Sequence, residues 1–433
     1  MSAKQCFHRQ DPMNSERLEG DSGTQRDPGA RPVISVIIPT YNHASLLPRA
    51  LDSIFAQEGT GDLFELEVIV VDDASSEDTG RAVRRYPQAR YVRLPTNRGA
   101  PSARNAGLEV ATGEYVGFLD DDDLWLPYKL KIQLPVLEAH PDAGLLYGQN
   151  IVLFGDQVSV WPGRDAPSGR VFQRLLMGNF VPIRTVLARQ AALRRVGGFD
   201  ESLSILDVND MWLRLAFHFP FVFQPGPVAI YRRHPGGLYI RGIVDGRSER
   251  EAEWLTEKAL ALLPETDEGA TVRREVRARV RIGFADELRS VGELGRLREQ
   301  LVSTLQEFTS LAGKRWMREA FGRLASDLSR MSQTPIAAVA ALRRDVACAQ
   351  GTLSLRDRWR MRRLWGRVWL DLARILAHDG SRIDRVVAAG VRALLCDPSL
   401  LRRRVTVDLI LRTVDSLPGP RLGRRRPRGA PGA

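Results

Sequence analysis

Short apolar runs alternate with amphipathic stretches between residues 33 and 148, and this alternation restricts the fold more than any other feature. The runs at 33–38, 66–71, 91–94 and 115–119 are rich in β-branched and aromatic residues, which favours strands. Apolar residues recur at helical spacing between them, as from Leu46 to Phe55. Strand–helix alternation of this kind builds a mostly parallel sheet with helices on both faces. The sequence therefore predicts an α/β fold.

Polar residues follow every one of these runs. They are Thr40-Tyr41-Asn42, Asp72-Asp73, Asn97-Arg98 and Asp120-Asp121-Asp122-Asp123, in chain order. Because ligands collect at the carboxyl ends of the strands in such sheets, we expect these side chains to line one cleft. Ser75 and Ser76 are expected to cap a helix at 77–86.

The four consecutive aspartates pose an electrostatic problem. Four carboxylates behind an apolar strand repel one another, at a cost on the order of several kcal/mol unless a cation is present. Oxygen ligands of this kind select Mg²⁺ or Mn²⁺. A solvated acidic loop is the alternative interpretation. The residues around the aspartates favour the metal.

Composition and length suggest more than one domain. A chain of 433 residues is too long for one ordinary core. After about residue 246 the strand-like runs disappear, and Leu, Ala, Arg and Glu recur at helical spacing. We therefore expect a disordered N-terminal tail at 1–31, an α/β domain at 32–245, a helical region at 246–417 and a disordered Arg/Pro-rich tail at 418–433.

Several features suggest a cytoplasmic location. Residues 1–31 lack the apolar core of a signal peptide, and no apolar run is long enough to span a bilayer. The three cysteines are scattered and form neither a disulfide framework nor a metal-ligand spacing. We therefore expect a protein of a reducing compartment.

The net charge of +11 comes largely from late arginines. Arg402-Arg403-Arg404 and the arginines between 421 and 428 account for much of the excess, and no aromatic residues interleave with them as in base-stacking surfaces. Specific nucleic-acid binding is therefore not expected. The Arg-rich tail is instead expected to make peripheral contact with anionic lipid at the inner face of the membrane.

Seven short motifs stand in order along the first half of the chain. They are SVIIPTYN at 35–42, VVDDAS at 70–75, NRG with ARN at 97–105, FLDDDD at 118–123, GGFDE at 197–201, MWLRL at 211–215 and YRRH at 231–234. Together they resemble glycosyltransferase family 2 over about residues 33–237. The resemblance implies a GT-A fold and inverting transfer from a nucleotide diphosphate-sugar to a hydroxyl acceptor, in polysaccharide or glycoconjugate synthesis.

The resemblance also assigns roles to individual residues. Asp120 and Asp122 match the family's Asp-x-Asp metal element, with Asp123 as the additional aspartate and His234 near the metal. The positions implied for the nucleotide-sugar are Pro39, Thr40, Tyr41, Asn42, Asp72, Asp73, Arg104, Asp120 and Asp121. The alternatives are turn formation for 39–42, helix capping for the strand-two aspartates, a surface arginine at 104 and a loop histidine at 234.

The chain departs from the family pattern at the general base. Aligning Asp210 with the motif aspartate places Val208 at the base position, and valine cannot accept a proton. Asp207, Asp210 and Arg214 share one helix face, so Asp210 is expected to pair with Arg214. We therefore expect Asp207 to be the base, with N-capping as its alternative role. If neither position supplies a base, the chain is a sugar-nucleotide-binding or scaffold protein that uses its helical region for interactions.

Overall fold

The computed structural model describes residues 30–311 except 235 and 264, the helix at 355–378, and the single positions 314, 317, 319, 323, 340, 343, 389, 392, 393 and 396. The described chain forms two compact units that divide after Pro264. Residues 1–29 of the expected N-terminal tail and the whole Arg/Pro-rich tail lie outside the described residues.

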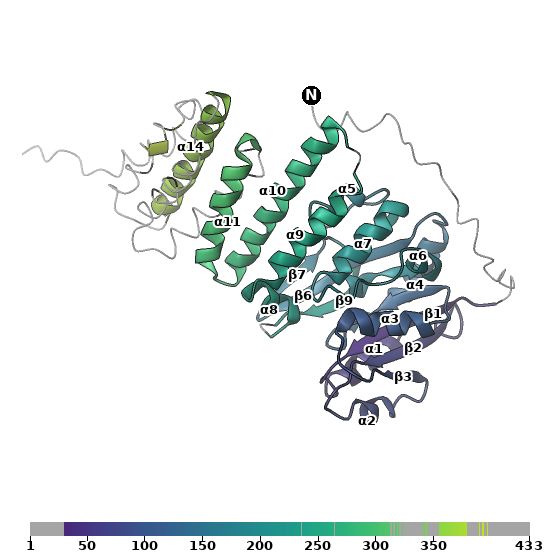
Figure 1. The fold of residues 1–433 in the computed structure, drawn as a ribbon. Helices are drawn as coiled ribbons and strands as arrows, with labels where there is room; N and C mark the ends of the chain where they lie inside the picture. Colours follow the sequence, from purple (N-terminus) through teal and green to yellow (C-terminus); the bar gives the residue numbers. More distant parts are fainter. Residues whose placement is uncertain are drawn as a thin grey trace, which may run out of the picture. The chain divides into compact units, whose positions relative to one another are not determined.

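The first unit alternates strands and helices as predicted. Its elements are β1 (Val33–Thr40), α1 (Leu47–Phe55), β2 (Glu65–Asp72), α2 (Thr79–Val83), β3 (Ala89–Arg93), α3 (Ala100–Val110), β4 (Tyr115–Phe118), β5 (Leu124–Trp125), α4 (Lys129–Glu138), β6 (Leu145–Phe154), β7 (Gln157–Trp161), α5 (Phe172–Leu175), η1 (Ile183–Thr185), β8 (Leu187–Arg189), α6 (Gln190–Arg195), α7 (Asp207–His218), β9 (Phe221–Arg232), α8 (Leu238–Val244) and α9 (Arg247–Leu260) (Figure 1).

One sheet joins these strands in the order β3-β2-β1-β4-β8-β6-β9-β5, with β7 paired to β6. The pairings of β1 with β2 and β4, and of β2 with β3, are parallel. The second half is mixed, because β8 runs antiparallel to β4 and β6 whereas β9 runs parallel to β6. The predicted α/β fold is confirmed, and its mixed second half adds strands that the sequence pattern did not reveal.

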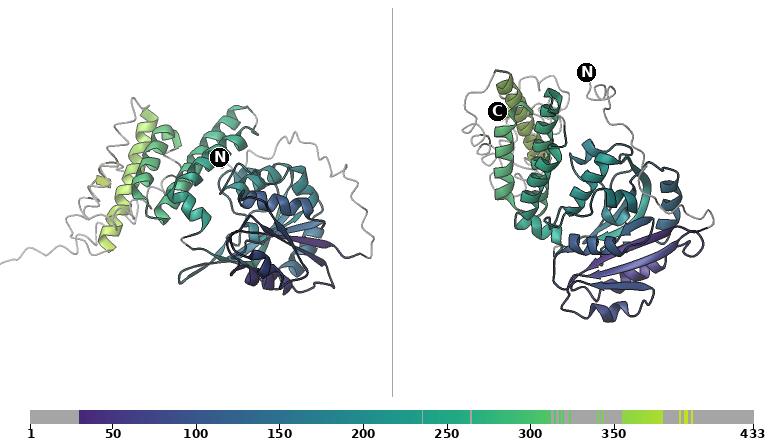
Figure 2. Two further views of the ribbon diagram at one scale, coloured as in Figure 1. Left: turned by 60° about the horizontal axis from the view of Figure 1, so that its bottom comes forward. Right: turned by 45° about the vertical axis from the view of Figure 1, so that its right-hand side comes forward.

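Helices cover both faces of the sheet (Figure 2). Side chains alternate between the two faces of a strand. On one face of β1, Ile34, Val36 and Ile38 pack in a single core with α1 and α4. On the other face, α3 lies so close that a Cβ at Gly107 would stand 2.5 Å from Ile37 Cγ2. Only glycine fits there. This contact fixes α3, and with it Arg104, against β1.

Two boundaries differ from those expected. The helix expected at 77–86 is only the short α2, and its N-cap is Asp78, whose carboxylate accepts a hydrogen bond from Arg81 N at 2.9 Å. Ser75 and Ser76 are instead used in turns, described below. The first unit also includes α9, a helix expected to lie in the helical region.

The second unit is helical where it is described. It contains α10 (Asp267–Ser290), α11 (Leu294–Glu307), η2 (Thr309–Leu311) and α14 (Leu355–His378). Within the part of the chain that the structure describes, none of the helices combines the length and apolarity needed to traverse a bilayer.

A lysine is buried in the core of the first unit. The Lys129 side chain is fully buried and donates hydrogen bonds to Gln133 Oε1 at 2.6 Å and to the carbonyl oxygen of Val186 at 3.2 Å. Its Nζ also lies 4.3 Å from the centroid of the Trp125 ring. Burial lowers the pKa of this amine well below its usual value. Folding therefore makes Lys129 harder to protonate than it is in the unfolded chain.

Replacing Lys129 with methionine should flatten the pH dependence of stability. The unfolded lysine binds a proton up to a pH near 10, whereas the folded one does not, so the free energy of unfolding rises with pH between the two pKa values. The wild type should therefore gain up to about 1.4 kcal/mol per pH unit relative to Lys129→Met. Urea unfolding at pH 8, 9 and 10 measures this difference. Parallel curves for the two proteins would show that Lys129 is charged in the folded state.

Candidate active site

The carboxyl ends of β1 and β2 meet at one edge of the sheet. Thr40 and Asp72, the last residues of the two strands, are register partners. The loops beyond them are joined by Asn42, which adopts a left-handed conformation with φ 56°. Asn42 N donates to Ser75 Oγ at 2.9 Å, and Asn42 Oδ1 accepts from Ser76 N at 2.8 Å. The predicted gathering of polar strand ends is therefore present for the first two strands.

Both aspartates at the end of β2 are occupied by donors of this chain. Asp72 is fully buried and accepts hydrogen bonds from Tyr91 Oη at 2.5 Å, Arg93 Nη1 at 2.6 Å and Ser75 N at 2.8 Å. Burial opposes the ionisation of Asp72, but these donors together hold its pKa below the usual value. Asp73 accepts from the backbone N–H groups of Arg98 at 2.8 Å and Gly99 at 2.7 Å.

These contacts give Asp72 and Asp73 structural roles. They fix the turn at Ser75 and the loop at 97–99 that leads into α3. The hydrogen bond expected from either aspartate to a nucleotide base stays a prediction.

The remaining predicted nucleotide positions differ in exposure. Pro39 is buried within β1, opposite Val71. Thr40 is also buried, and its hydroxyl has no hydrogen-bond partner within the structure. Tyr41 is 46% exposed at the same edge. The exposed ring of Tyr41 suits a flat heterocycle, because aromatic rings stack on bases.

Arg104 joins two predicted site residues that lie far apart in the sequence. Its guanidinium donates from Nη2 to Asp120 Oδ1 at 2.8 Å and from Nη1 to Asp207 Oδ2 at 2.6 Å. Arg104 is only 5% exposed and Asp207 only 4%. The arginine is therefore not the surface residue that the alternative interpretation of position 104 assumed. It links the predicted Asp-x-Asp element on one strand end to the predicted base on α7.

Arg184, in η1, occupies the other side of the aspartate cluster. Its Nε contacts Asp123 Oδ2, and its Nη2 lies 3.8 Å from Asp120 Oδ2. The guanidinium also stacks over the Tyr231 ring, 4.0 Å from its centroid. Burial raises the pKa of the Asp123 carboxyl, and the ion pair with Arg184 opposes this shift. For Asp120, burial likewise opposes ionisation, but Arg104 and Arg184 outweigh it and lower the pKa.

Two histidines engage the other two aspartates. His43 Nδ1 lies 2.8 Å from Asp121 Oδ1, and His234 Nε2 lies 3.5 Å from Asp122 Oδ2. The hydrogen bond to Asp121 raises the pKa of His43, although partial burial opposes it. The pKa of Asp122 is raised by burial and by the charges of Asp120 and Asp121. Each of the four aspartates thus faces a cationic or ionisable partner of this chain.

The predicted metal set is not assembled in the structure. Among the described residues, no three or more His, Cys, Asp or Glu side chains are placed to hold one ion. Asp123 faces Arg184 rather than Asp122 and His234. The residues do fit a smaller site, because Mg²⁺ is often held by one or two carboxylates together with substrate phosphates and water. Asp122 suits that role, since its contact with His234 is long and no arginine binds it among the described residues.

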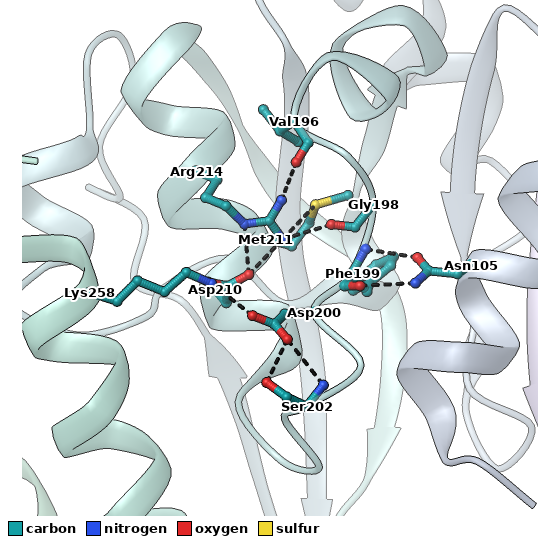
Figure 3. Close-up of polar contacts among 10 residues, drawn as sticks. All are labelled: Asn105, Val196, Gly198, Phe199, Asp200, Ser202, Asp210, Met211, Arg214 and Lys258. Atoms are coloured by element: carbon teal, nitrogen blue, oxygen red, sulfur yellow. Dashed lines mark hydrogen bonds and ion pairs between the residues drawn. The ribbon is translucent and has the colours of Figure 1, made fainter.

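The two aspartates of α7, Asp207 and Asp210, have different partners and different roles. Asp210 is 1% exposed, and its carboxylate binds Arg214, as predicted, and also Lys258 Nζ at 2.7 Å (Figure 3). The N-cap residue of α7 is Leu206, so Asp207 is the first residue of the helix rather than its cap. Burial raises the pKa of Asp207 although Arg104 opposes the shift. Asp207 remains the candidate base, and Asp210 holds the helix in place.

Three residues of this network were absent from the sequence-based set: Arg184, His43 and Lys258. Arg184 could have been identified from the sequence. It is a lone arginine in the apolar run 180–186, and an arginine buried in such a run needs a charged partner. His43 stands in a polar loop, and Lys258 stands at one charged position of an amphipathic helix. Nothing in their neighbourhood distinguishes them from surface positions.

Removal of the Arg104 side chain should lower the stability of the protein. Arg104→Met leaves the buried Asp207 and the partly exposed Asp120 without their shared cation, and we expect a loss of about 3–5 kcal/mol in the free energy of unfolding. In the background of Asp207→Asn the same change should cost less, because one of the two charges is already gone. A double-mutant cycle by urea unfolding measures this coupling. Additive effects would show that the two residues do not interact.

Comparisons with known proteins agree with the motif assignment. The profile of glycosyl transferase family 2 matches residues 35–201. An uncharacterized glycosyltransferase of Haemophilus influenzae is 28% identical over 185 residues, which cover 42% of this chain and 62% of that protein. The uncharacterized protein MT1568 of Mycobacterium tuberculosis is 32% identical over 224 residues, which cover 47% of this chain and 68% of the relative.

A solved structure also aligns with this chain. It is that of the mannosyltransferase PcManGT from Pyrobaculum calidifontis in complex with GDP-Man and Mn²⁺, with a TM-score of 0.47, 22% identity and coverage of 77% of this chain and 91% of that one. The chain spans less than two thirds of the length of the Haemophilus relative. The motifs, the family profile and the mycobacterial relative together place the chain in glycosyl transferase family 2.

Proposed function

We propose that the protein transfers a sugar, with inversion, from a nucleotide diphosphate-sugar to a hydroxyl acceptor. One observation carries the proposal. A single buried guanidinium, that of Arg104, holds the donor-side aspartate Asp120 and the candidate base Asp207 at the same edge of the sheet. Donor and acceptor must meet between these two groups for an in-line displacement.

The donor would lie across the carboxyl ends of β1, β2 and β4. The exposed ring of Tyr41 is available to the base and ribose. Arg104 and Arg184, which hold Asp120 between them, supply positive charge to the diphosphate. Asp121, fixed by His43, would contact the sugar. Asp72 and Asp73 support this arrangement by shaping the two loops.

We further propose that Mg²⁺ or Mn²⁺ binds at Asp122, with Asp120 nearby and His234 at the rim. When bound, the ion acts as a Lewis acid that neutralises the charge developing on the leaving diphosphate. Charge balance supports this assignment. Arg104 and Arg184 already face the carboxylates of Asp120, Asp123 and Asp207, so they offset only part of the negative charge that a diphosphate adds.

Asp207 would accept the proton of the acceptor hydroxyl. The oxygen then forms a bond to the anomeric carbon while the bond from that carbon to the diphosphate oxygen breaks, and the nucleotide diphosphate leaves with the electron pair. A base works best when its pKa approaches the working pH. Burial moves the pKa of Asp207 in that direction, and the Arg104 contact keeps the carboxylate aimed at the donor side.

The acceptor and the cellular location are part of the proposal. Family membership supports an acceptor in polysaccharide or glycoconjugate synthesis. The arginines between 421 and 428 support a cytoplasmic protein that contacts anionic lipid.

Asp207→Asn should abolish turnover and spare donor binding. Loss of the base should lower the rate of transfer, or of slow donor hydrolysis, by about 10²–10⁴-fold. Calorimetry with a panel of nucleoside diphosphates should show unchanged affinity. Asp142→Asn, the same change at an exposed position after α4, serves as the matched control. Unchanged hydrolysis in Asp207→Asn would remove Asp207 as the base. A wild type that binds nucleotide without any turnover would favour the scaffold alternative.

Asp122→Asn should remove the metal dependence of donor binding. In the wild type, Mn²⁺ should strengthen the binding of a nucleoside diphosphate, and chelation by EDTA should reverse this effect, because Asp122 would hold a cation that offsets the charge of the diphosphate. In Asp122→Asn the affinity should be the same with and without Mn²⁺. Calorimetry measures both, with Asp142→Asn as control. Equal affinity in wild type with Mn²⁺ and with EDTA would contradict the metal assignment.

A further inference from the structure

α9 lies beyond the matched family segment, yet it binds the chain on both sides of Asp207. Glu251 accepts four hydrogen bonds from the residues just before α7. The donors are Ser204 N at 2.9 Å, Ser204 Oγ at 2.6 Å, Ile205 N at 2.9 Å and Leu206 N at 2.9 Å. One carboxylate therefore collects three consecutive backbone N–H groups.

The Glu251 carboxylate places negative charge near the N-terminus of α7. The N-cap position is occupied by Leu206, which has no side chain able to accept a hydrogen bond. The N-terminus of a helix also carries partial positive charge, which favours a nearby carboxylate. Glu251 supplies that acceptor charge from a neighbouring helix. The carboxylate of Asp207 takes a backbone hydrogen bond from Val208 and also binds Arg104.

Lys258 makes the second contact. Its Nζ lies 2.7 Å from Asp210 Oδ1 and 2.8 Å from Asp200 Oδ2, so it joins α7 to the loop after α6 (Figure 3). Arg214 binds the same Asp210 carboxylate from within α7, and its Nη2 donates to the carbonyl oxygen of Gly198 at 2.7 Å. Burial opposes the ionisation of Asp200, yet Lys258 and Ser202 lower its pKa to about 2. Asp200 is therefore ionised at neutral pH, and its charge faces Lys258.

The two contacts act together because of their spacing. Glu251 and Lys258 are seven residues apart and lie on one face of α9, with the buried Leu255 between them. Glu251 fixes the chain immediately before Asp207, and Lys258 fixes Asp210 one turn after it. We propose that α9 is a positioning helix for the active site, and that Glu251 and Lys258 hold the first turn of α7 so that Asp207 meets the acceptor hydroxyl.

The inference rests on the proposed function and is tested by two separate measurements. Hydrogen–deuterium exchange of peptides covering residues 204–210 reports the position of the α7 start without reference to activity. Steady-state kinetics with a nucleotide-sugar donor report its consequence. The variants are Glu251→Gln, Lys258→Met and Lys258→Arg. Glu253→Gln, the same change on the exposed side of α9, is the matched control.

We expect Glu251→Gln and Lys258→Met to lower kcat by about tenfold or more, because small displacements of a catalytic group are costly. The KM for the donor should stay within about twofold, since the donor residues lie on other elements. The acidic limb of the pH–rate profile should move, because the surroundings of Asp207 change. Lys258→Arg should restore kcat, and Glu253→Gln should match the wild type. Exchange at 204–210 should accelerate in Glu251→Gln and in Lys258→Met, and should match the wild type in Lys258→Arg and Glu253→Gln.

Several results would overturn the inference. Faster exchange with unchanged kcat and an unchanged pH profile would make Glu251 a structural residue alone. Should Glu251→Gln fail to fold, the comparison of Lys258→Met with Lys258→Arg decides, and equal kcat values in the two variants would reject positioning. A wild type without turnover but with the same exchange pattern would refute the proposed function, since α7 would then be fixed for no transfer reaction.

Discussion

The active edge of this protein depends on one buried guanidinium. Arg104 binds Asp120 and Asp207 at once, and the burial of Arg104 and Asp207 means that losing either partner would leave an uncompensated buried charge. The geometry of this bridge requires three elements to meet. α3 must lie close on β1, which Gly107 permits, β4 must end at the aspartates, and α7 must begin at Asp207.

The negative charge of the four consecutive aspartates is offset by the protein itself. Their mutual repulsion alone suggests that a metal ion is required. That argument is correct that cations must be present, but the chain provides partners for all four carboxylates. Arg104 and Arg184 bind Asp120 and Asp123, whereas His43 and His234 face Asp121 and Asp122. A metal is therefore not needed to make the fold tolerate its aspartates. The proposed metal would instead neutralise the negative charge of the donor diphosphate.

The elements of the first unit could be predicted because their signals are local. The apolar runs that became β1, β2, β3 and β4 and the helical spacing of α1 carried enough information by themselves, and so did the four-residue interval between Asp210 and Arg214. The partners of the site residues could not be predicted in the same way. The contacts of Arg184 with Asp123 and of Glu251 with the start of α7 join positions 61 and 45 to 47 residues apart, and only the folded chain shows them.

The shift of the candidate base from 208 to 207 has a geometric consequence. Successive residues of a helix point about 100° apart, so a carboxylate at 207 does not replace one at 208 by simple proximity. Asp207 points toward Arg104 and the donor side, whereas Val208 has no such partner to orient it. If Asp207 accepts the proton, the acceptor hydroxyl must approach from the direction that Arg104 sets. In that case the start of α7 determines the acceptor geometry, and α9 determines the start of α7.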